Sequence, residues 1–338
     1  MLKNEHRQLI GVDFGAASVK LAVLSRDGRE QRLEAAALAP VGPERTPDAY
    51  EAALSSVMDA ADGYGKRVAT SVSGPHVAVR TLHFPKLDTS EIEGAVWYEG
   101  GQVIAFEIDN SMVDYETLDR SGAGKKTNVL FAAATKEEIA KRTATLDACG
   151  LEPRVVGVDG LVLLDALLSN AELPPTSGIL DIGARYACLG VSRTGAVPFV
   201  RDIDIAGDTF THAISDALGV SALEAEEIKL SGDWNDARVK HAIEATTRWL
   251  VGEVNRSLIY YRTREDGSEV DRLYLCGGAS QTPGLRRAMS DSLEIEVEHW
   301  NPFKDVNIDS ERFDNGLIER LRPSMSLAVA LAMKDDPR

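Results

Sequence analysis

Residues 10–20 read Ile-Gly-Val-Asp-Phe-Gly-Ala-Ala-Ser-Val-Lys, and this stretch decides how the rest of the chain is interpreted. An apolar run over residues 9–12 reaches Asp13 and Gly15, turns through small residues, and leaves as a second apolar run over 19–24. The pattern predicts two strands joined by a tight turn.

The residue types in this turn suit a phosphate loop that also holds a metal ion. Gly15 lets the backbone approach an anion closely, and the side chains of Ser18 and Lys20 can donate to phosphate oxygens. Asp13 would repel phosphate directly, so its expected partner is a hydrated Mg²⁺. Taken alone, the short Asp-x-Gly pattern is explained equally well by an ordinary β-hairpin.

The second half of the chain repeats this element. Residues 178–185 read Gly-Ile-Leu-Asp-Ile-Gly-Ala-Arg, so that Asp181 and Gly183 correspond to Asp13 and Gly15. A strand over 187–192 and an Arg193-Thr194-Gly195 turn then match the strand and the Arg26-Asp27-Gly28 turn of the first half. Such a duplication predicts two α/β lobes whose hairpins face each other across a cleft and hold a triphosphate between them. Chance similarity of two hairpins is the alternative.

Composition narrows the class of protein. The chain has 338 residues, of which 44% are hydrophobic and 27% charged, which is typical of a globular protein of two or more lobes. Its net charge of -16 disfavours binding to nucleic acid and to anionic lipid, and we find no basic stripe that offsets the charge locally. Nucleotide binding stays compatible with this charge because Mg²⁺ screens the phosphates.

The three cysteines and the apolar segments indicate a cytoplasmic protein. Cys149, Cys188 and Cys276 are an odd number, widely spaced and set in apolar runs, so we expect buried thiols rather than disulfides. The N-terminal residues lack the apolar core of a signal peptide. We find no apolar run long enough to span a membrane, so association with a membrane would require a partner.

The order of strand-like and helical stretches predicts a mixed α/β chain with a small inserted domain. We assign five parts, which are a first nucleotide-binding lobe (1–75), an inserted α/β subdomain (76–156), a helix returning to the first lobe (157–175), a second nucleotide-binding lobe (176–322) and a C-terminal helix packing on the first lobe (323–338). The inserted subdomain reads β-α-β-β-α-β, and the acidic stretch around 305–314 reads as a loop.

Two further features suit the nucleoside part of a nucleotide. Gly277 and Gly278 follow a buried strand, where a glycine pair lets a flat ring or a ribose approach the backbone. Glu226 and Lys229 lie three residues apart on one helix face and could clasp a ribose or an adenine edge. The alternatives are a tight strand-to-helix turn and a surface ion pair. Other motifs fail, since there is no P-loop, nucleophile elbow or His-Glu-x-x-His zinc site.

Taken together, these motifs resemble the actin-like ATPase superfamily, whose ribonuclease H-like fold is duplicated. A small domain inserted between the two hairpins is similar to the FtsA-like branch, and within it to the PilM family of type IV pilus assembly proteins. The matching stretches cover nearly the whole chain in the right order, at residues 10–20, 71–80, 129–134, 149–151, 180–183, 201–202 with 207, 225–229, 275–278 and 283–285.

The resemblance implies ATP and Mg²⁺ as ligands and assigns residues to them. The implied nucleotide contacts are Asp13, Gly15, Ser18, Lys20, Asp181, Gly183, Gly207, Glu226, Lys229, Gly277 and Gly278, with Asp13 and Asp181 holding Mg²⁺ through water. Relatives usually carry serines at the positions of Ala16 and Ala17, and glycine at that of Ala206, so this chain lacks some of the usual phosphate contacts. Asp159 is nearest to the position that orients the attacking water, and it suits a structural role as well as a catalytic one.

The resemblance also implies a partner, the short cytoplasmic N-terminal segment of the membrane protein PilN. Such a segment would bind beside the inserted subdomain through main-chain hydrogen bonds and apolar anchors. The residues expected to line this groove are Val77, Val79, Leu82, Phe84 and Trp97, unless they are simply core.

We therefore expect a cytoplasmic nucleotide-binding scaffold of type IV pilus assembly, peripheral to the inner membrane through partners and at most a slow ATPase. Other inner-membrane components of a pilus or secretion machine, and a homo-oligomer or ring, are further expected partners. The alternatives are a cytoplasmic component of a type II secretion-like system, an actin-fold small-molecule kinase and a filament-forming cytoskeletal protein.

Overall fold

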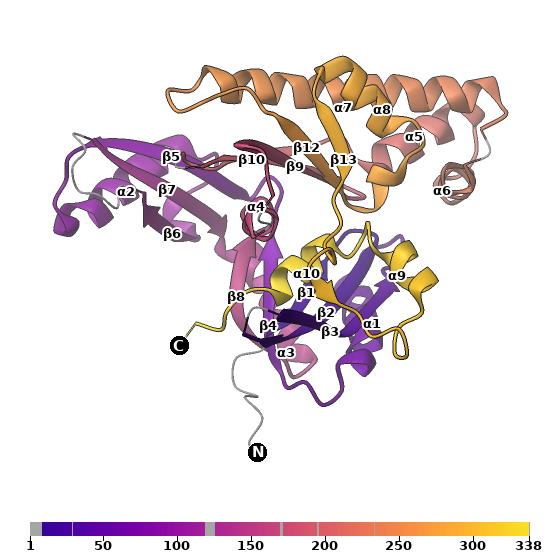
Figure 1. Cartoon of the computed structure of the whole chain (residues 1–338), viewed down its shortest axis with the longest axis horizontal. Helices are drawn as coiled ribbons and strands as arrows, with labels where there is room; N and C mark the ends of the chain where they lie inside the picture. Colours follow the sequence, from indigo (N-terminus) through magenta and orange to yellow (C-terminus); the bar gives the residue numbers. More distant parts are fainter. Residues whose placement is uncertain are drawn as a thin grey trace.

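The computed structural model describes residues 9–28, 30–118, 126–169, 172–194, 196–232 and 234–337, apart from the side chain of Asn315. Three sheets organise these residues, and Figure 1 shows two larger sheets with a smaller one to their side. Most of the 121–126 turn, and Gly195 of the second turn, lie outside the described residues.

The first sheet carries the first Asp-x-Gly hairpin at its centre. Its strand order is β14-β3-β2-β1-β4-β8, and β1 and β2 are antiparallel, with Asp13 opposite Lys20. The bounds of its strands are β1 (Ile10–Phe14), β2 (Ser18–Asp27), β3 (Glu30–Pro40), β4 (Arg67–Val72), β8 (Glu152–Val158) and β14 (Val306–Asn307). Apolar side chains of α1 (Pro47–Met58) and α3 (Lys136–Ala148) close a core over one face of this sheet.

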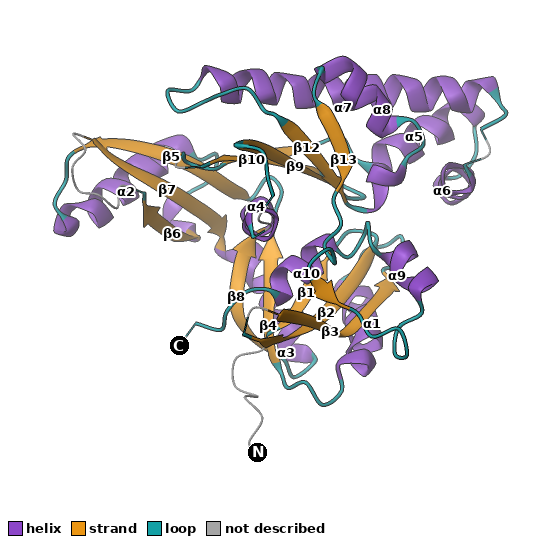
Figure 2. Ribbon diagram, in the orientation of Figure 1, coloured by secondary structure: helices purple, strands orange, loops and turns teal. Residues whose placement is uncertain are grey.

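The second sheet repeats the hairpin, as the sequence predicts. Its order is β11-β10-β9-β12-β13, with β9 and β10 antiparallel and Asp181 opposite Cys188. The strand bounds are β9 (Thr176–Ile182), β10 (Ala187–Arg193), β11 (Phe199–Ile203), β12 (Arg272–Cys276) and β13 (Glu296–His299). The apolar stripe of the long helix α7 (Ala237–Thr263) packs on the outer face, together with α5 (Gly207–Leu218) and α8 (Leu285–Leu293) (Figure 2).

The third sheet is small, and one of its strands contacts β11 of the second sheet. It has the order β5-β7-β6, from β5 (Val77–Pro85), β6 (Ser111–Thr117) and β7 (Lys126–Thr135). Helix α2 (Thr89–Val103) covers one face, where Ile92 and Val96 pack on Leu82 and Phe131. A capping box between Asp88 and Glu91 sets the start of this helix.

Two parts of the expected inserted subdomain belong to the first sheet instead. Strand β8, which we placed in the insert, pairs in parallel with β4, and Leu146 of α3 lies in the core of the first sheet. The β-α-β-β-α-β reading is therefore wrong for its last two elements. The physical reason is that the edge of β4 offers hydrogen bonds to β8, and this long-range pairing leaves no local signature.

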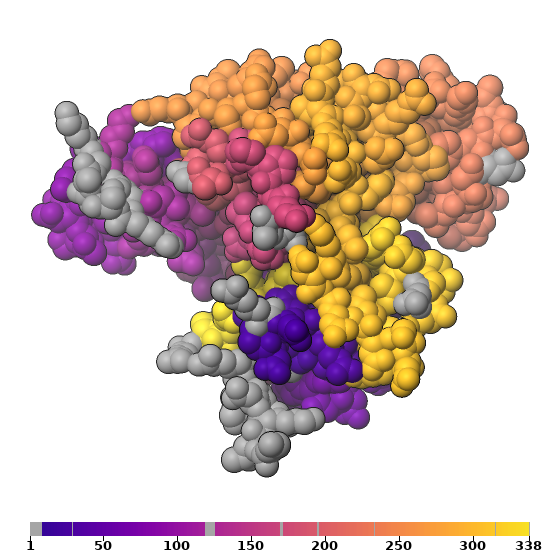
Figure 3. Space-filling view, in the orientation of Figure 1, coloured from indigo at the N-terminus to yellow at the C-terminus, as the bar shows by residue number. Residues whose placement is uncertain are grey.

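The chain also returns to the first sheet earlier than expected. Strand β14 pairs with β3, and Ile318 of α9 (Asn315–Leu321) packs in one core cluster with Leu24 and Leu33. The stretch that we read as a loop thus contains a two-residue strand, and α9 follows it. Figure 3 shows this C-terminal region, in yellow, directly beside the N-terminal residues in indigo.

Helix α10 (Ser326–Ala332) packs on the first sheet, as expected. All seven of its residues are buried, and a Cβ atom at Gly11 would lie 2.1 Å from the Ala328 carbonyl oxygen. Helices α10 and α4 (Asp159–Leu168) share a core cluster with residues of both larger sheets, Ala69 among them. This cluster is the main apolar connection between the two halves.

The remaining elements are α6 (Ala222–Ser231) and three short 3₁₀ turns, η1 (Asp59–Ala61), η2 (Ile108–Asn110) and η3 (Gly278–Gln281). Among the residues that the structure describes, no helix combines the length and the apolar character that a membrane span requires.

Candidate nucleotide site

The first hairpin holds an aspartate and a lysine together. Lys20 Nζ lies 2.9 Å from Asp13 Oδ2, and both side chains are largely buried. The antiparallel register of β1 and β2 sets this contact, since it places the two residues opposite each other. Thr70 Oγ1 donates to the Val12 carbonyl oxygen at 2.9 Å and fixes the end of β1.

Gly15 is required by the position of the lysine. A Cβ atom at this residue would lie 2.3 Å from Lys20 Nζ and 3.1 Å from the Ser18 carbonyl oxygen. Any larger residue would therefore displace the ammonium group, and Gly15 keeps the inner side of the turn open.

The second hairpin is joined to the start of a helix. The amides of Gly207 and Asp208 donate to the carbonyl oxygens of Gly183 and Ala184, at 3.0 and 2.6 Å. A Cβ atom at Gly207 would approach Ala184 and Gly183 to about 3.3 Å. The N-terminus of α5 thus lies directly against the Asp-x-Gly turn, where its positive end of the helix dipole favours anions.

The charges of four carboxylates from four elements influence one another, and we call this set the carboxylate cluster: Asp13, Asp159, Asp181 and Asp202. Loss of hydration, followed by the charges of Asp13 and Asp159, raises the pKa of Asp181 to about 7. Loss of hydration also raises the pKa of Asp159 to about 6, against hydrogen bonds from Ser71 and Ser73 and with a contribution from the charge of Asp13.

Asp202 is a member that sequence reasoning named only as part of a family motif. Burial raises its pKa, although the Gly74 amide donates to Asp202 Oδ2 at 2.7 Å. It lies on β11, a strand that the sequence analysis did not predict. The thiols of Cys188 and Cys276 lie beside Asp202 and Asp181, and burial raises the pKa of both thiols well above its usual value. The expectation of buried, unbridged cysteines is confirmed for these two.

The cluster suits a hydrated divalent cation. Burial, followed by nearby negative charge, raises the pKa values of Asp181 and Asp159, and Lys20, 2.9 Å from Asp13, is a basic neighbour of the cluster. A cation placed there would relieve the repulsion, and Mg²⁺ that keeps most of its waters needs only one or two carboxylates. Among the described residues, no group of three or more His, Cys, Asp or Glu side chains forms a direct metal-ligand set.

The glycine pair lies at the same place. The backbone of Gly277 has φ of +84°, and a Cβ atom there would lie 2.2 Å from Asp181 Oδ1. Its amide donates to the Pro323 carbonyl oxygen at 2.8 Å, which ties the turn to the returning C-terminal segment. Gly278 begins the short turn η3, so the pair brings backbone close to the second hairpin.

Glu226 and Lys229 form an ion pair, which the sequence analysis named as the alternative to a nucleoside contact. The pair also makes contacts to neighbouring elements that an isolated surface pair would lack. Lys229 Nζ lies 2.6 Å from Glu226 Oε2 and also donates to the Gly207 carbonyl oxygen at 3.1 Å. Both side chains contact Thr211, which lies one turn into α5. The pair therefore lies next to the start of α5 and the second hairpin.

Arg45 and Asp208 connect the two halves, and the sequence analysis missed them. Arg45 lies in the loop after β3, and its Nη1 is 2.7 Å from Asp208 Oδ2 at the start of α5. The hydrogen bond to Asp208, with the nearby charge of Glu226, raises the pKa of Arg45. A contact between residues 163 positions apart leaves no signal in one sequence.

The five expected partner-binding residues do not share one surface. Val77 and Val79 lie on one face of β5, and Val79 packs with α4 and Val200. Leu82 and Phe84 lie on the opposite face, under α2, and Trp97 is 44% exposed on that helix. A single groove can therefore include only part of the set.

Comparisons with known proteins agree with this geometry. Residues 11–336 match the family model described as type IV pilus assembly protein PilM. The structure is similar to that of a PilM–PilN type IV pilus biogenesis complex, with 30% identity and a TM-score of 0.86, covering 96% of this chain and 98% of that one.

More distant solved structures share the fold. The ethanolamine utilization protein EutJ from Carboxydothermus hydrogenoformans has 14% identity and a TM-score of 0.57, covering 97% of this chain and 89% of that one. MreB 5 of Spiroplasma citri, solved with AMPPNP, has 12% identity and a TM-score of 0.52, with 96% and 95% covered. The expected actin-like α/β fold is thus confirmed.

Proposed function

The chain belongs to the PilM family of type IV pilus assembly proteins, and on this premise we propose that it is a nucleotide-operated scaffold that docks a PilN-type membrane protein. Mg·ATP binds between the two hairpins and draws the lobes together. Closure in turn changes the affinity for the partner segment. The protein works in the cytoplasm and reaches the inner membrane through its partners.

The observation that carries the nucleotide part is the electrostatic coupling of the two hairpins. After burial, the charge of Asp13 is the next cause of the raised pKa of Asp181, although the two residues are 168 positions apart and belong to different sheets. A cation between two carboxylates that repel each other stabilises the ionised form of both. The glycines beside them leave room for the phosphates that such a cation accompanies.

Each residue around the cluster has a separate task in this proposal. Lys20 and the Ser18 hydroxyl bind phosphate oxygens. The turn at Gly183 lies against the remaining phosphates of the nucleotide. Asp13 and Asp181 hold Mg²⁺ through water, and the bound ion would neutralise phosphate charge. Glu226, Lys229, Gly277 and Gly278 line the nucleoside. Ala16 and Ala17 supply no donor beyond their amides.

The test of the nucleotide site is calorimetric titration of Mg·ATP into Asp13→Ala and Lys20→Ala. Both variants should lose measurable affinity, because each removes a charge that the ligand contacts, while circular dichroism remains that of the parent. Asp62→Asn, an exposed carboxylate outside the cluster, is the matched control and should bind as the parent does. Unchanged affinity in both variants would refute the site.

For the partner, we propose the face of the three-stranded sheet that carries Val77 and Val79. This face turns toward α4 and the second sheet, so a bound segment there would respond to movement of the lobes. The face that carries Leu82 and Phe84 is already covered by α2.

A pair of variants distinguishes the two faces. Val77→Asp should abolish binding of a synthetic N-terminal PilN peptide, measured by fluorescence anisotropy, because it places a charge in an apolar contact. Trp97→Asp makes the same kind of change on α2 and should leave the affinity unchanged. Loss of binding in Trp97→Asp alone would place the partner on the α2 side instead.

A further inference from the structure

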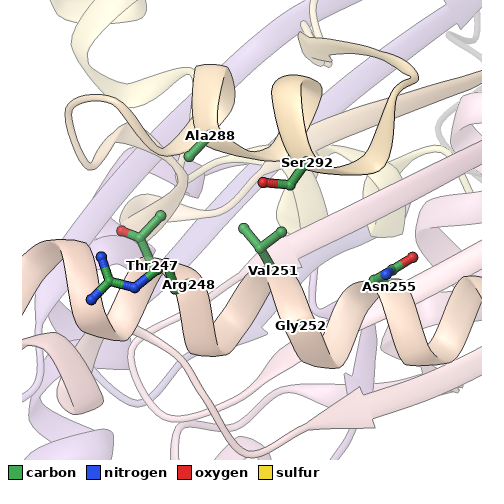
Figure 4. A pocket seen from close by; sticks show the side chains of 7 residues that line it. All are labelled: Thr247, Arg248, Val251, Gly252, Asn255, Ala288 and Ser292. Atoms are coloured by element: carbon green, nitrogen blue, oxygen red, sulfur yellow. The ribbon is translucent and has the colours of Figure 1, made fainter.

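A groove lies between α7 and α8, on the outer side of the second sheet (Figure 4). Its volume is about 240 Å³, and none of its residues belongs to the carboxylate cluster or to the three-stranded sheet. It is lined by Thr247, Arg248, Val251, Gly252, Asn255, Ala288 and Ser292. The floor is made of small and apolar side chains, and the rim is polar.

The polar groups of this rim have no partner within the described part of the chain. No hydrogen bond or ion pair is recorded there for the guanidinium of Arg248, the amide of Asn255 or the hydroxyls of Thr247 and Ser292. A guanidinium, an amide and two hydroxyls at one groove can together bind a carboxylate and a peptide main chain.

Gly252 has no structural reason to be glycine. It lies in the middle of a 27-residue helix, where glycine is unfavourable, and a Cβ atom there would meet nothing within 4 Å. Packing within the chain does not require the missing side chain. The open space at Gly252 therefore suits a side chain from another molecule.

The charge of these two helices differs from that of the whole chain. The chain has a net charge of -16, yet α7 and α8 are both locally basic. Helix α7 carries Arg238, Lys240, Arg248, Arg256 and Arg262 against Glu244 and Glu253, and α8 carries Arg286 and Arg287 against Asp291.

We propose that the groove between α7 and α8 is a second docking site, for an acidic segment of a protein partner. An Asp or Glu side chain of the segment pairs with Arg248. A small aliphatic side chain next to it fills the space above Gly252 and Ala288, and Asn255 and Ser292 bind its main chain. This site is separate from the nucleotide site and from the proposed PilN face.

A protein segment fits better than a lipid surface. Most arginines of this layer already have acidic partners, as Arg238 has Asp236 and Arg262 has Glu269. Lipid binding draws on many free cations spread over a flat face, whereas here one free guanidinium stands at a concave site. A single charge beside a small pocket suits one anchoring side chain with a defined neighbour.

The test uses the full chain and a random peptide library, selected on the parent protein and counter-selected on Gly252→Leu. This variant places a larger side chain in the groove, at a position where an added Cβ meets nothing within 4 Å, and it replaces glycine by a better helix former, so the fold and Mg·ATP binding should persist. The selected peptides should carry Asp or Glu beside a small aliphatic residue.

Affinities of the best peptide then decide the proposal. Gly252→Leu, Arg248→Glu and a peptide with its acid changed to the amide should each weaken binding about tenfold or more. Arg262→Glu makes the same charge change on α7 outside the groove and should stay within about twofold. Glu244→Gln, which removes a negative charge one turn before Arg248, should strengthen binding.

Several results would overturn the proposal. These are the absence of any selected peptide, selected peptides without an acid, and equal binding to Gly252→Leu. Co-sedimentation with phosphatidylglycerol vesicles that Arg248→Glu abolishes and Gly252→Leu does not would assign the site to a membrane. A dimer in sedimentation velocity that Gly252→Leu abolishes would assign it to a second copy of the chain.

Discussion

Two glycines of the proposed nucleotide site, Gly15 and Gly277, have different neighbours, so we expect different results when they are changed to alanine. At Gly15 the nearest atom is the mobile end of Lys20, at 2.3 Å from an added Cβ. The lysine can move aside, so Gly15→Ala should weaken Mg·ATP binding in calorimetry and leave the melting temperature nearly unchanged.

At Gly277 the obstacle is the backbone itself. An added Cβ would lie 2.5 Å from the Ile182 carbonyl oxygen, and φ is +84°. Gly277→Ala should therefore lower the free energy of unfolding by about 2 kcal/mol or more in urea denaturation. Gly42→Ala, whose Cβ meets nothing within 4 Å, is the control. Equal stability of the Gly277 variant and this control would contradict the packing described for the turn.

The raised pKa values of Asp181 and Asp159 predict how stability depends on pH. The folded, ligand-free protein holds protons on these groups up to about pH 7 and 6, whereas the unfolded chain releases them near pH 3.8. Their contribution to stability is therefore complete below about pH 4 and is lost as the pH rises to about 7. At about 1.36 kcal/mol per pKa unit, the loss at Asp181 is at most about 4 kcal/mol.

Asp181→Asn removes this dependence in part. Both proteins should be compared without nucleotide. The melting temperature of the variant minus that of the parent should increase as the pH rises from 5 to 8, because the variant holds no charge at this position. Asp62→Asn should follow the parent at every pH. A constant difference between Asp181→Asn and the parent over this range would show that Asp181 is ionised throughout.

At the residue scale, the sequence could predict only what is local. Asp13, Gly15 and Lys20 lie within one hairpin, so the antiparallel register brings them together. Arg45 and Asp208 meet through the whole fold, and neither belongs to a short motif. The surroundings of Asp159 are also set by distant carboxylates, so its raised pKa could not be read from its neighbours in the chain.

At the scale of elements, the backbones of β1 and α10 approach each other closely at Gly11. An added Cβ at Gly11 would lie 2.1 Å from the Ala328 carbonyl oxygen and 2.5 Å from the Ala332 amide nitrogen. Gly11→Ala should therefore cost about 2 kcal/mol or more in the free energy of unfolding, measured with urea.

A second glycine gives the opposite expectation and serves as the control. Gly94 lies inside α2 and an added Cβ there meets nothing within 4 Å. Gly94→Ala should stabilise the protein by about 0.5–1 kcal/mol, because alanine loses less backbone entropy in a helix. If Gly11→Ala proved as stable as Gly94→Ala, the close packing of α10 on β1 would be wrong.

Long helices and strands leave a periodic pattern in the sequence, whereas very short elements do not. Helix α3 was expected as the second helix of the β-α-β-β-α-β order, while the short elements β14 and α9 were missed because so few residues define no period. The two faces of β5 were available from the sequence, since successive residues of a strand alternate. That alternation separates Val77 and Val79 from Leu82 and Phe84.

At the scale of the whole molecule, Arg45 and Asp208 join the two lobes beside the proposed nucleotide site. Arg45→Ala should speed the release of a fluorescent ATP analogue about two- to fivefold in stopped-flow measurements, because a partly exposed pair contributes up to about 1 kcal/mol to the closed form. The double variant Arg45→Asp with Asp208→Arg should restore the parent rate.

The control for this prediction is another ion pair between distant parts of the chain. Lys126 lies 2.9 Å from Glu265, between β7 and the loop after α7, away from the hairpins. Lys126→Ala should leave the release rate unchanged. Equal acceleration by both variants would mean that the effect is general destabilisation rather than opening of the site.

The two-lobed plan itself was predictable because the chain repeats one local element twice. What the sequence could not supply was the path of the chain between the lobes. Strand β8 and the region of β14 to α10 return to the first sheet through long-range pairing and burial. Their partners lie far away in the chain, so no period or turn signal marks them.

The central claim is that both hairpins hold one nucleotide, and the second hairpin tests it most directly. Mg·ATP should be titrated calorimetrically into Asp181→Ala, in which the first hairpin with Asp13 and Lys20 is intact. We predict that affinity falls about tenfold or more, because the shared cation loses one of its two carboxylates. An affinity equal to that of the parent would contradict a site built from both hairpins.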